Sequence, residues 1–212
     1  MRLTGRRWLG YASITAVAFL TVVLLVPLTL SRWLREALFV RLYTLIMYFM
    51  ADDLVPVRKQ VMSYMDAMDS HDDCLRKEGL LRVLEIGAGY GANLPYIRRK
   101  IKYSNVDPNK EFDTLLMQEL AKYKGVHLED SICGHGEDMH SLPDGHFDAV
   151  VMTFVLCSAD DGHKLLQEVK RVLTKSREKN TRFLVAYPST ISYTSKVLQE
   201  RRVATTLERS TP

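Results

Sequence analysis

The stretch LRVLEIGAGYGAN, residues 81–93, constrains the fold of this chain more than any other feature. Its apolar run from Leu81 to Ile86 has the length of a buried strand and ends in three glycines separated by single residues. Glycines at such positions allow the tight turn that carries a buried strand into a helix. The stretch therefore predicts a strand, a ligand-binding loop and a helix in succession.

After this loop, segments typical of strands alternate with segments typical of helices. The expected strands are 81–86, 102–106, 126–129, 147–153 and 182–187, and the expected helices are 92–100, 109–123 and 161–173. This alternation predicts a doubly wound α/β fold with a mostly parallel sheet and right-handed crossovers. Ligands of such folds bind at the carboxyl ends of the strands.

The first 51 residues form a separate hydrophobic unit. Residues 8–31 contain no charged residue, and a helix of that length, at about 1.5 Å per residue, crosses roughly 30 Å of hydrocarbon. The run is longer than the apolar part of a cleaved signal peptide, so we expect an uncleaved membrane anchor. A second apolar stretch, 37–51, is too short to span and carries Tyr43 and Tyr48. We expect a helix in the lipid headgroup region there, with a core helix as the alternative.

Charge divides the chain in the same way. Residues 1–60 hold eight Lys and Arg against three Asp and Glu, whereas residues 61–173 hold 13 against 19. The basic end suits an anionic membrane, and the acidic body argues against a nucleic-acid partner. The three cysteines are too widely spaced for a disulfide framework or a zinc site, so we expect no metal. Nothing in the sequence specifies an oligomeric state.

Residues 52–79 connect this unit to the α/β domain, which we place at 80–187. Apolar residues recur here at helical spacing, among them Val61, Met65 and Met68. The pattern predicts an amphipathic helix followed by a linker. Packing against the core is favoured for its methionine-rich face, and a lid over a pocket is the alternative.

The glycine loop is compatible with more than one cofactor. Gly87, Gly89 and Ala92 satisfy the dinucleotide fingerprint G-x-G-x-x-G/A, which makes NAD a candidate. Glu85, two residues before Gly87, would repel a pyrophosphate. Its carboxylate can instead accept a hydrogen bond, direct or through water, from the ammonium group of S-adenosyl-L-methionine (SAM). Glu85 therefore favours SAM.

Two further acids fit the same ligand. Asp107, in the motif NVDPN, ends the second strand, where its short side chain can accept both ribose hydroxyls. Asp138 lies in a loop ahead of a later strand, where it can accept the adenine amine, while Met139 offers the ring an apolar surface. A loop or capping role for Asp138 is the alternative.

Taken together, LEIGAGYGANLPY, NVDPN, GEDMHSLPDGHFDAVVMTFVLCS and EVKRVL resemble the class I, Rossmann-like, SAM-dependent methyltransferases. More narrowly, the chain resembles the membrane-associated methyltransferase-like seven group, the alkyl thiol S-methyltransferases of the endoplasmic reticulum and lipid droplets. The resemblance implies methyl transfer from SAM to a small lipophilic thiol at the endoplasmic reticulum membrane and on lipid droplets. Because SAM is a cytosolic cofactor, we expect the domain on the cytosolic face. The residues that it implies for the cofactor are Glu85, Gly87, Gly89, Gly91, Asp107, Asp138, Met139 and Thr153, with Thr153 to Leu156 lining the sulfonium side.

A dedicated strong base is not obligatory for this reaction, and the sequence does not identify a catalytic residue. A thiol with a pKa near 8.5 is about a few per cent ionised at neutral pH, and the enzyme gains chiefly by aligning thiolate and methyl group. His135 and His140 lie in the loop that approaches the ligand, yet we expect surface or capping roles for them rather than help to the thiol. Cys157 has no base partner in the sequence, so we expect it to be buried as a small apolar residue.

The carboxyl end departs from the family. After RVL the family continues with a basic residue, Pro and two glycines, and then a strand, a helix and an antiparallel hairpin; this chain continues TKSREKN. Residues 182–187 can form the fifth strand, whereas 188–212 are polar and lack strand alternation. We expect a sheet that is incomplete at this end, a disordered basic tail at 188–212, and an atypical or truncated form. Two alternative functions follow: an inactive relative on membrane or lipid-droplet surfaces, and a nucleotide-dependent oxidoreductase, which Glu85 and Asp138 disfavour.

Overall fold

A computed structural model describes residues 29, 31–174 and 182–186 of the 212. The chain divides into two compact units, residues 1–48 and 49–212. The second unit contains the sheet and the candidate site. The described part of the first unit is essentially one helix, α2 (Arg32–Phe49), whose last residue already belongs to the second unit.

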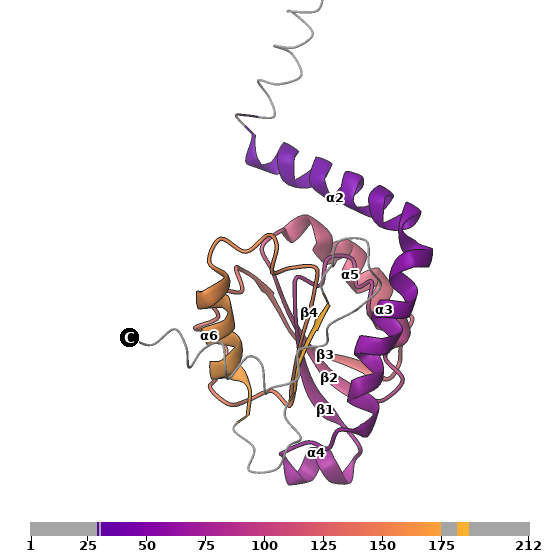
Figure 1. Cartoon of the computed structure of the whole chain (residues 1–212), viewed down its shortest axis with the longest axis vertical. Coiled ribbons are helices and arrows are strands. Elements are labelled where there is room, and N and C mark those ends of the chain that lie inside the picture. The colour runs from indigo at the N-terminus through magenta and orange to yellow at the C-terminus, as the bar shows by residue number, and fades with distance from the viewer. Residues whose placement is uncertain (1–28, 30, 175–181, 187–212) are drawn as a thin grey trace, which may run out of the picture. The chain divides into compact units, whose positions relative to one another are not determined.

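Five parallel strands form one sheet in the order β3-β2-β1-β4-β5 (Figure 1). The strands are β1 (Leu81–Ile86), β2 (Ile101–Asp107), β3 (Val126–Cys133), β4 (Ala149–Thr153) and β5 (Arg182–Ala186). The chain winds outward from β1 through β2 to β3 and then returns to β4 on the other side of β1. The carboxyl ends of β1 and β4 therefore meet at the switch point where such sheets bind ligands.

Helices cover both faces of this sheet, as the predicted doubly wound fold requires (Figure 1). Helices α3 (Ala51–Ser63) and α5 (Asp113–Leu120) lie on one face and α6 (Gly162–Val172) on the other. The shorter elements are η1 (Tyr64–Ala67), α4 (Asp73–Lys77), η2 (Leu94–Tyr96) and η3 (Lys110–Phe112). The predicted parallel α/β fold is confirmed.

Strand β1 divides the core into two clusters. Leu81 and Val83 pack on the α3 face, and Leu84 and Ile86 pack on the α6 face, as alternation along a strand requires. The methionine-rich face of the segment after α2 joins the first cluster, with Met65 fully buried. Each such side chain contributes about 1.5–3 kcal/mol by leaving water. The core-packing interpretation of this face is therefore confirmed.

The helix expected at 92–100 is wrong. The chain forms turns there and one 3-10 turn, η2, and is extended again at Ile97. Strand β2 begins at Ile101, and the guanidinium of Arg99 donates to the carbonyls of Met65 and Gly79 at 2.9 and 3.0 Å. These tertiary bonds hold the end of the segment away from a helical path.

The linker before β1 is anchored to the domain. The backbone N–H of His71 donates to Asp148 Oδ1 at 2.8 Å, and its ring Nδ1 lies 2.5 Å from the same oxygen. Asp148 Oδ2 accepts the backbone N–H of Arg82 at 2.8 Å, so one buried carboxylate joins the linker to β1. Asp72 caps α4 by accepting from the N–H groups of Cys74 and Leu75.

Helix α2 exposes much of its apolar surface. Its exposed large apolar side chains include Leu38, Leu42, Leu45 and Phe49, which recur along one stripe of the helix. None of the helices that the structure describes is long and apolar enough to cross a membrane. Apart from Thr29 and Ser31, the predicted anchor at 8–31 lies outside the described residues, and so does the predicted tail at 188–212.

Candidate functional site

The α3-facing side of the sheet changes from apolar to polar at its carboxyl end. Along β1 the side chains on this face are Leu81, Val83 and then Glu85, and along β4 the series ends in Thr153. Strand β2 ends in Asp107 in the same way. Alternation along adjacent parallel strands thus brings three polar side chains together above an apolar core.

The glycine loop begins directly after Glu85 and Ile86. Gly87, Gly89 and Gly91 have φ values of +67°, +54° and +85°, a conformation that side chains with a Cβ rarely adopt. A Cβ on Gly87 would also overlap the side chain of Val155, which follows β4. The loop therefore lies tightly against the end of β4, as a turn around a ligand site requires.

Asp107 holds this loop from β2. Its Oδ2 accepts the N–H of Gly89 and its Oδ1 accepts the N–H of Asn109, both at 2.9 Å. Burial raises the pKa of Asp107, and the two backbone hydrogen bonds oppose that shift. Each oxygen retains a further lone pair, so the carboxylate can receive a pair of ligand hydroxyls. Its position agrees with the ribose role predicted from the sequence, which remains a prediction.

Glu85 is the centre of a buried hydrogen-bond network. Its Oε1 accepts from Asn93 Nδ2 and its Oε2 accepts from the hydroxyl of Tyr103, both at 2.6 Å. Asn93 Nδ2 also donates to Thr153 Oγ1 at 2.9 Å. Burial raises the pKa of Glu85, and the two side-chain donors lower it. Protein donors thus engage both oxygens of the carboxylate that was predicted to face a ligand ammonium group.

Arg58 of α3 enters the same network. Its Nη1 donates to Asn93 Oδ1 at 2.7 Å, and the side chain is only 5% exposed. Its guanidinium carbon lies 5.5 Å from the centre of the Phe154 ring, within the range of a cation–π contact. Sequence reasoning missed Arg58, Asn93 and Tyr103. The available signal was Arg58 itself, a cation on the helical stripe that continues with Val61 and Met65.

The loop after β3 packs closely against the end of β1 and against α6 at Gly136. Gly136 is buried, and a Cβ there would lie 2.6 Å from Leu165 Cδ1 and 2.8 Å from Ile86 Cγ2. Asp138, in contrast, is exposed and lies 2.9 Å from His140 Nδ1, in a surface hollow lined partly by α6. His140 lowers the pKa of Asp138. These contacts match the loop-acid alternative, and the adenine role of Asp138 remains a prediction.

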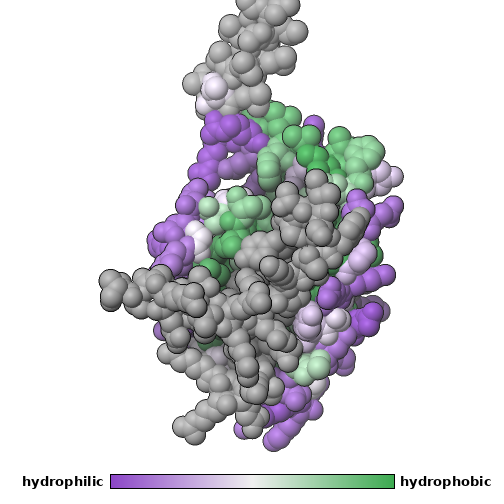
Figure 2. Space-filling model, in the orientation of Figure 1, coloured by the Kyte–Doolittle hydropathy of each residue, from purple (hydrophilic) through white to green (hydrophobic). Residues whose placement is uncertain are grey.

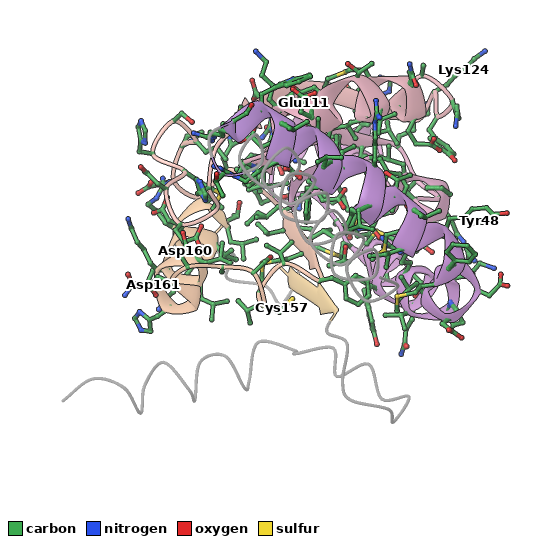
Figure 3. The ribbon with its side chains drawn as sticks, turned by 90° about the horizontal axis from the view of Figure 1, so that it is seen from above. Tyr48, Glu111, Lys124, Cys157, Asp160 and Asp161 are labelled. Atoms are coloured by element: carbon green, nitrogen blue, oxygen red, sulfur yellow. The ribbon has the colours of Figure 1, made fainter. Side chains whose placement is uncertain are left out.

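Two side chains lie elsewhere than predicted. Met139 is 1% exposed and packs in the core cluster on the α6 face, so its side chain offers no apolar surface to a ring. Cys157 was expected to be buried, yet it is exposed in the segment between β4 and α6 (Figure 3). Its Sγ lies 3.3 Å from the carbonyl oxygen of Phe154, so the turn at this point directs the thiol outward.

The two histidines of the loop after β3 take surface positions, as expected, and two further histidines lie nearby in the sequence. His135 and His140 are exposed, and His163 lies in the first turn of α6, where its N–H donates to the capping residue Asp161 at 2.9 Å. His146 packs edge-on against Phe147. None of these contacts gives a histidine a reacting partner within the described residues.

As a whole, the site combines a tight glycine turn, two buried carboxylates and one buried guanidinium. The carboxylates suit a ligand that carries a positive charge and a pair of hydroxyls. The cation, Arg58, is turned to Asn93 and Phe154. This set of carboxylate acceptors fits a cationic nucleoside better than a pyrophosphate, which would face Glu85 and Asp107 at the strand ends.

Comparison with known proteins shows a similarity to methyltransferases. Residues 84–176 match the family model described as a methyltransferase domain. Over 95 residues the chain is 40% identical to human thiol S-methyltransferase TMT1B, which covers 45% of this chain and 39% of that protein. Human thiol S-methyltransferase TMT1A is 38% identical over 95 residues, and this match also covers 45% of this chain and 39% of that protein. The matched region thus spans well under half of these relatives.

A solved structure agrees at the level of the fold. A protein from Methanococcus maripaludis, assigned as an S-adenosyl-L-methionine-dependent methyltransferase, superposes with a TM-score of 0.50 at 11% identity. The match covers 79% of this chain and 70% of that one. Together with the family match, it confirms the predicted class I methyltransferase fold.

Proposed function

We propose that this chain, which carries a methyltransferase domain over residues 84–176, transfers the methyl group of SAM to a small lipophilic thiol. The observation that carries the proposal is the position of Asp107, which binds the N–H of Gly89 while its oxygens retain lone pairs for a diol. The glycine turn and the ribose acceptor are thereby joined in one preformed cradle.

Several residues of the chain suit the parts of this cofactor. The loop of Gly87, Gly89 and Gly91 would hold the methionine end, Asp107 the ribose, and the loop with Asp138 the adenine. SAM supplies a methyl group already activated by its sulfonium. The buried carboxylates of Glu85 and Asp107 favour a ligand of positive charge at this place.

The acceptor side of the site supports an apolar substrate. Phe154, Val155 and Leu156 follow β4 at the switch point and are all partly buried. Thiols are the acceptors named for the human relatives TMT1A and TMT1B. Because a thiol is partly ionised at neutral pH, holding it in line with the methyl group is sufficient chemistry for the protein.

Helix α2 supports a membrane location for the same activity. Figure 2 shows apolar surface along this helix, where Trp33, Leu42 and Phe49 are exposed. Aromatic residues near the ends of the helix and the cations Arg32, Arg35 and Arg41 are typical of a helix that lies in the headgroup region. A membrane also concentrates lipophilic thiols beside the enzyme. On the resemblance noted above we place the domain at the endoplasmic reticulum membrane and on lipid droplets, and we place it on their cytosolic side because SAM is a cytosolic cofactor.

Methyl transfer can be tested with matched acceptors. The full chain in detergent is given SAM and an alkyl thiol, alcohol or amine of the same chain length, and the products are identified by mass spectrometry. We expect the methyl thioether only, in yields that rise with alkyl length. Transfer to the amine or alcohol instead would refute the thiol assignment, and SAM binding without any product would favour the inactive-relative alternative.

The membrane proposal has a separate test. In a chain with its three cysteines replaced by serine, Leu42→Cys is labelled with an environment-sensitive dye and mixed with anionic vesicles. We expect a blue-shifted emission that brominated lipids quench. The same dye at Glu36→Cys, on another side of α2, should be much less affected. Equal, water-like emission at both positions would contradict a helix in the headgroup region.

A further inference from the structure

Helix α3 reaches the cofactor site through one buried side chain. Arg58 projects from the apolar face of α3, and its Nη1 donates to Asn93 Oδ1 at 2.7 Å. Asn93 lies in the segment that follows the glycine loop, and it is itself 1% exposed. A charged residue on the core face of a helix is costly unless its partners recover that cost. The partners of Arg58 therefore indicate its role.

The bond from Arg58 orients the amide of Asn93. A guanidinium can only donate, so it selects the carbonyl oxygen of the amide. Nδ2 must then point the other way, where Glu85 Oε1 and Thr153 Oγ1 accept from it at 2.6 and 2.9 Å. One arginine thus fixes the amide that links the carboxyl ends of β1 and β4.

The chain of bonds also joins two opposite buried charges. The amide of Asn93 links Glu85 to Arg58. Glu85 also accepts from the hydroxyl of Tyr103 on β2 and senses the charge of Asp107 farther along the same strand. Burial and Asp107 raise the pKa of Glu85, whereas Tyr103, Asn93 and Arg58 lower it. Arg58 is the cation in this group, and it opposes protonation of Glu85.

Arg58 contacts a third segment on its other side. Its guanidinium lies 5.5 Å from the ring centre of Phe154, in the turn after β4. Within the described residues, Phe154 is the one non-glycine residue with a positive φ, at +61°. Such strain persists only where the surroundings hold it. Arg58 thus contacts the strained turn at Phe154 as well as Asn93, in the segment that follows the glycine loop.

We propose that Arg58 is a positioning residue of the methyltransferase site, which orients Asn93 and the Phe154 turn and pairs, through the amide of Asn93, with the buried carboxylate of Glu85. The inference rests on the proposed function for its SAM readout, and its charge pairing can be measured without any ligand. In this arrangement, docking of α3 is coupled to cofactor affinity.

The test compares Arg58→Gln and Arg58→Lys with Lys59→Gln in the full chain. Lys59 is the next residue of α3 and is exposed, so its substitution removes the same charge without touching the network. SAM affinity is measured by calorimetry between pH 5 and pH 8. We expect Arg58→Gln to weaken binding at least about tenfold at neutral pH, because the charged hydrogen bond to Asn93 is lost. Arg58→Lys should recover part of the affinity, and Lys59→Gln should match the wild type.

The pH profile separates this role from simple loss of packing. Removing Arg58 raises the pKa of Glu85, so the loss of SAM binding on acidification should begin at a higher pH in Arg58→Gln than in the wild type. Unchanged affinity with an unchanged pH profile would overturn the proposal.

Unfolding experiments give a readout that needs no cofactor. In a double-mutant cycle, Arg58→Gln should destabilise the Glu85→Gln chain less than it destabilises the wild type, because the carboxylate that requires a cation is absent. Additive effects would overturn the charge pairing. A wild type that does not bind SAM but shows this coupling would refute the proposed function and leave the pairing of Arg58 with Glu85 supported.

Discussion

Asp107→Asn is the most informative single change in the candidate site. The substitution keeps the shape of the side chain but replaces one carboxylate oxygen by an NH₂ group and removes the charge. In the structure the two oxygens accept from the N–H groups of Gly89 and Asn109, both at 2.9 Å. After the substitution, one of these backbone donors must face another donor.

The expected magnitudes follow from those bonds. One charge-assisted hydrogen bond to the ribose is lost, at about 1.5–3 kcal/mol, which corresponds to a Kd for SAM about 10- to 150-fold higher. A buried backbone N–H is also left without an acceptor, which costs about 1–3 kcal/mol of folding stability. Binding and stability should therefore both decrease, with binding measured well below the melting temperature of the variant.

The assay is calorimetric titration of SAM into the wild type, Asp107→Asn and Asp69→Asn. Asp69 is exposed, so its substitution makes the same chemical change outside the site. We expect wild-type affinity for Asp69→Asn and a large loss for Asp107→Asn. Equal affinity in a folded Asp107→Asn chain would refute the assignment of Asp107 to the ribose.

Other predictions concern the turn, the linker and pH. Gly87→Ala should destabilise the fold more than Gly79→Ala in thermal unfolding, because both have φ near +67° but only Gly87 lacks room for a Cβ. Asp148→Asn should increase hydrogen exchange in residues 69–73, since the 2%-exposed carboxylate anchors that linker through His71. On acidification, SAM binding should be lost before the fold, as followed by calorimetry and circular dichroism over one pH series. The pKa of Glu85 is raised above its unfolded value, so protonation of Glu85 as the pH falls weakens cofactor binding but adds folding stability. Carboxyls with lowered pKa values, such as Asp72 and Glu168, protonate at lower pH, and folding stability is lost there.

Elements that depend on local pattern were predictable from the sequence. Strand β1 has the predicted bounds, and the apolar face with Val61 and Met65 packs in the core as expected. Asp107 occupies the end of β2 because strand alternation and the following Pro108 fix that position. These features follow from the order of residues along one segment, which is what a sequence displays directly.

The network around Glu85 was not predictable in the same way. It joins Arg58, Asn93 and Tyr103 from three segments, and their meeting depends on how α3 docks against the sheet. The ligand-facing position expected for the Met139 side chain, in the loop after β3, was wrong for a related reason. Without a regular period, the sequence could not show that Met139 faces the core while Asp138 faces solvent. The exposed position of Cys157 likewise follows from the tight turn that begins at Phe154.

The central claim is that the glycine turn and the strand-end carboxylates form a SAM site. Its most direct test is a calorimetric titration of the detergent-solubilised full chain with SAM, S-adenosylhomocysteine and NAD. We predict saturable binding of SAM and S-adenosylhomocysteine at one site per chain, with no binding of NAD. A folded chain that binds NAD in preference, or binds none of the three, would contradict the claim.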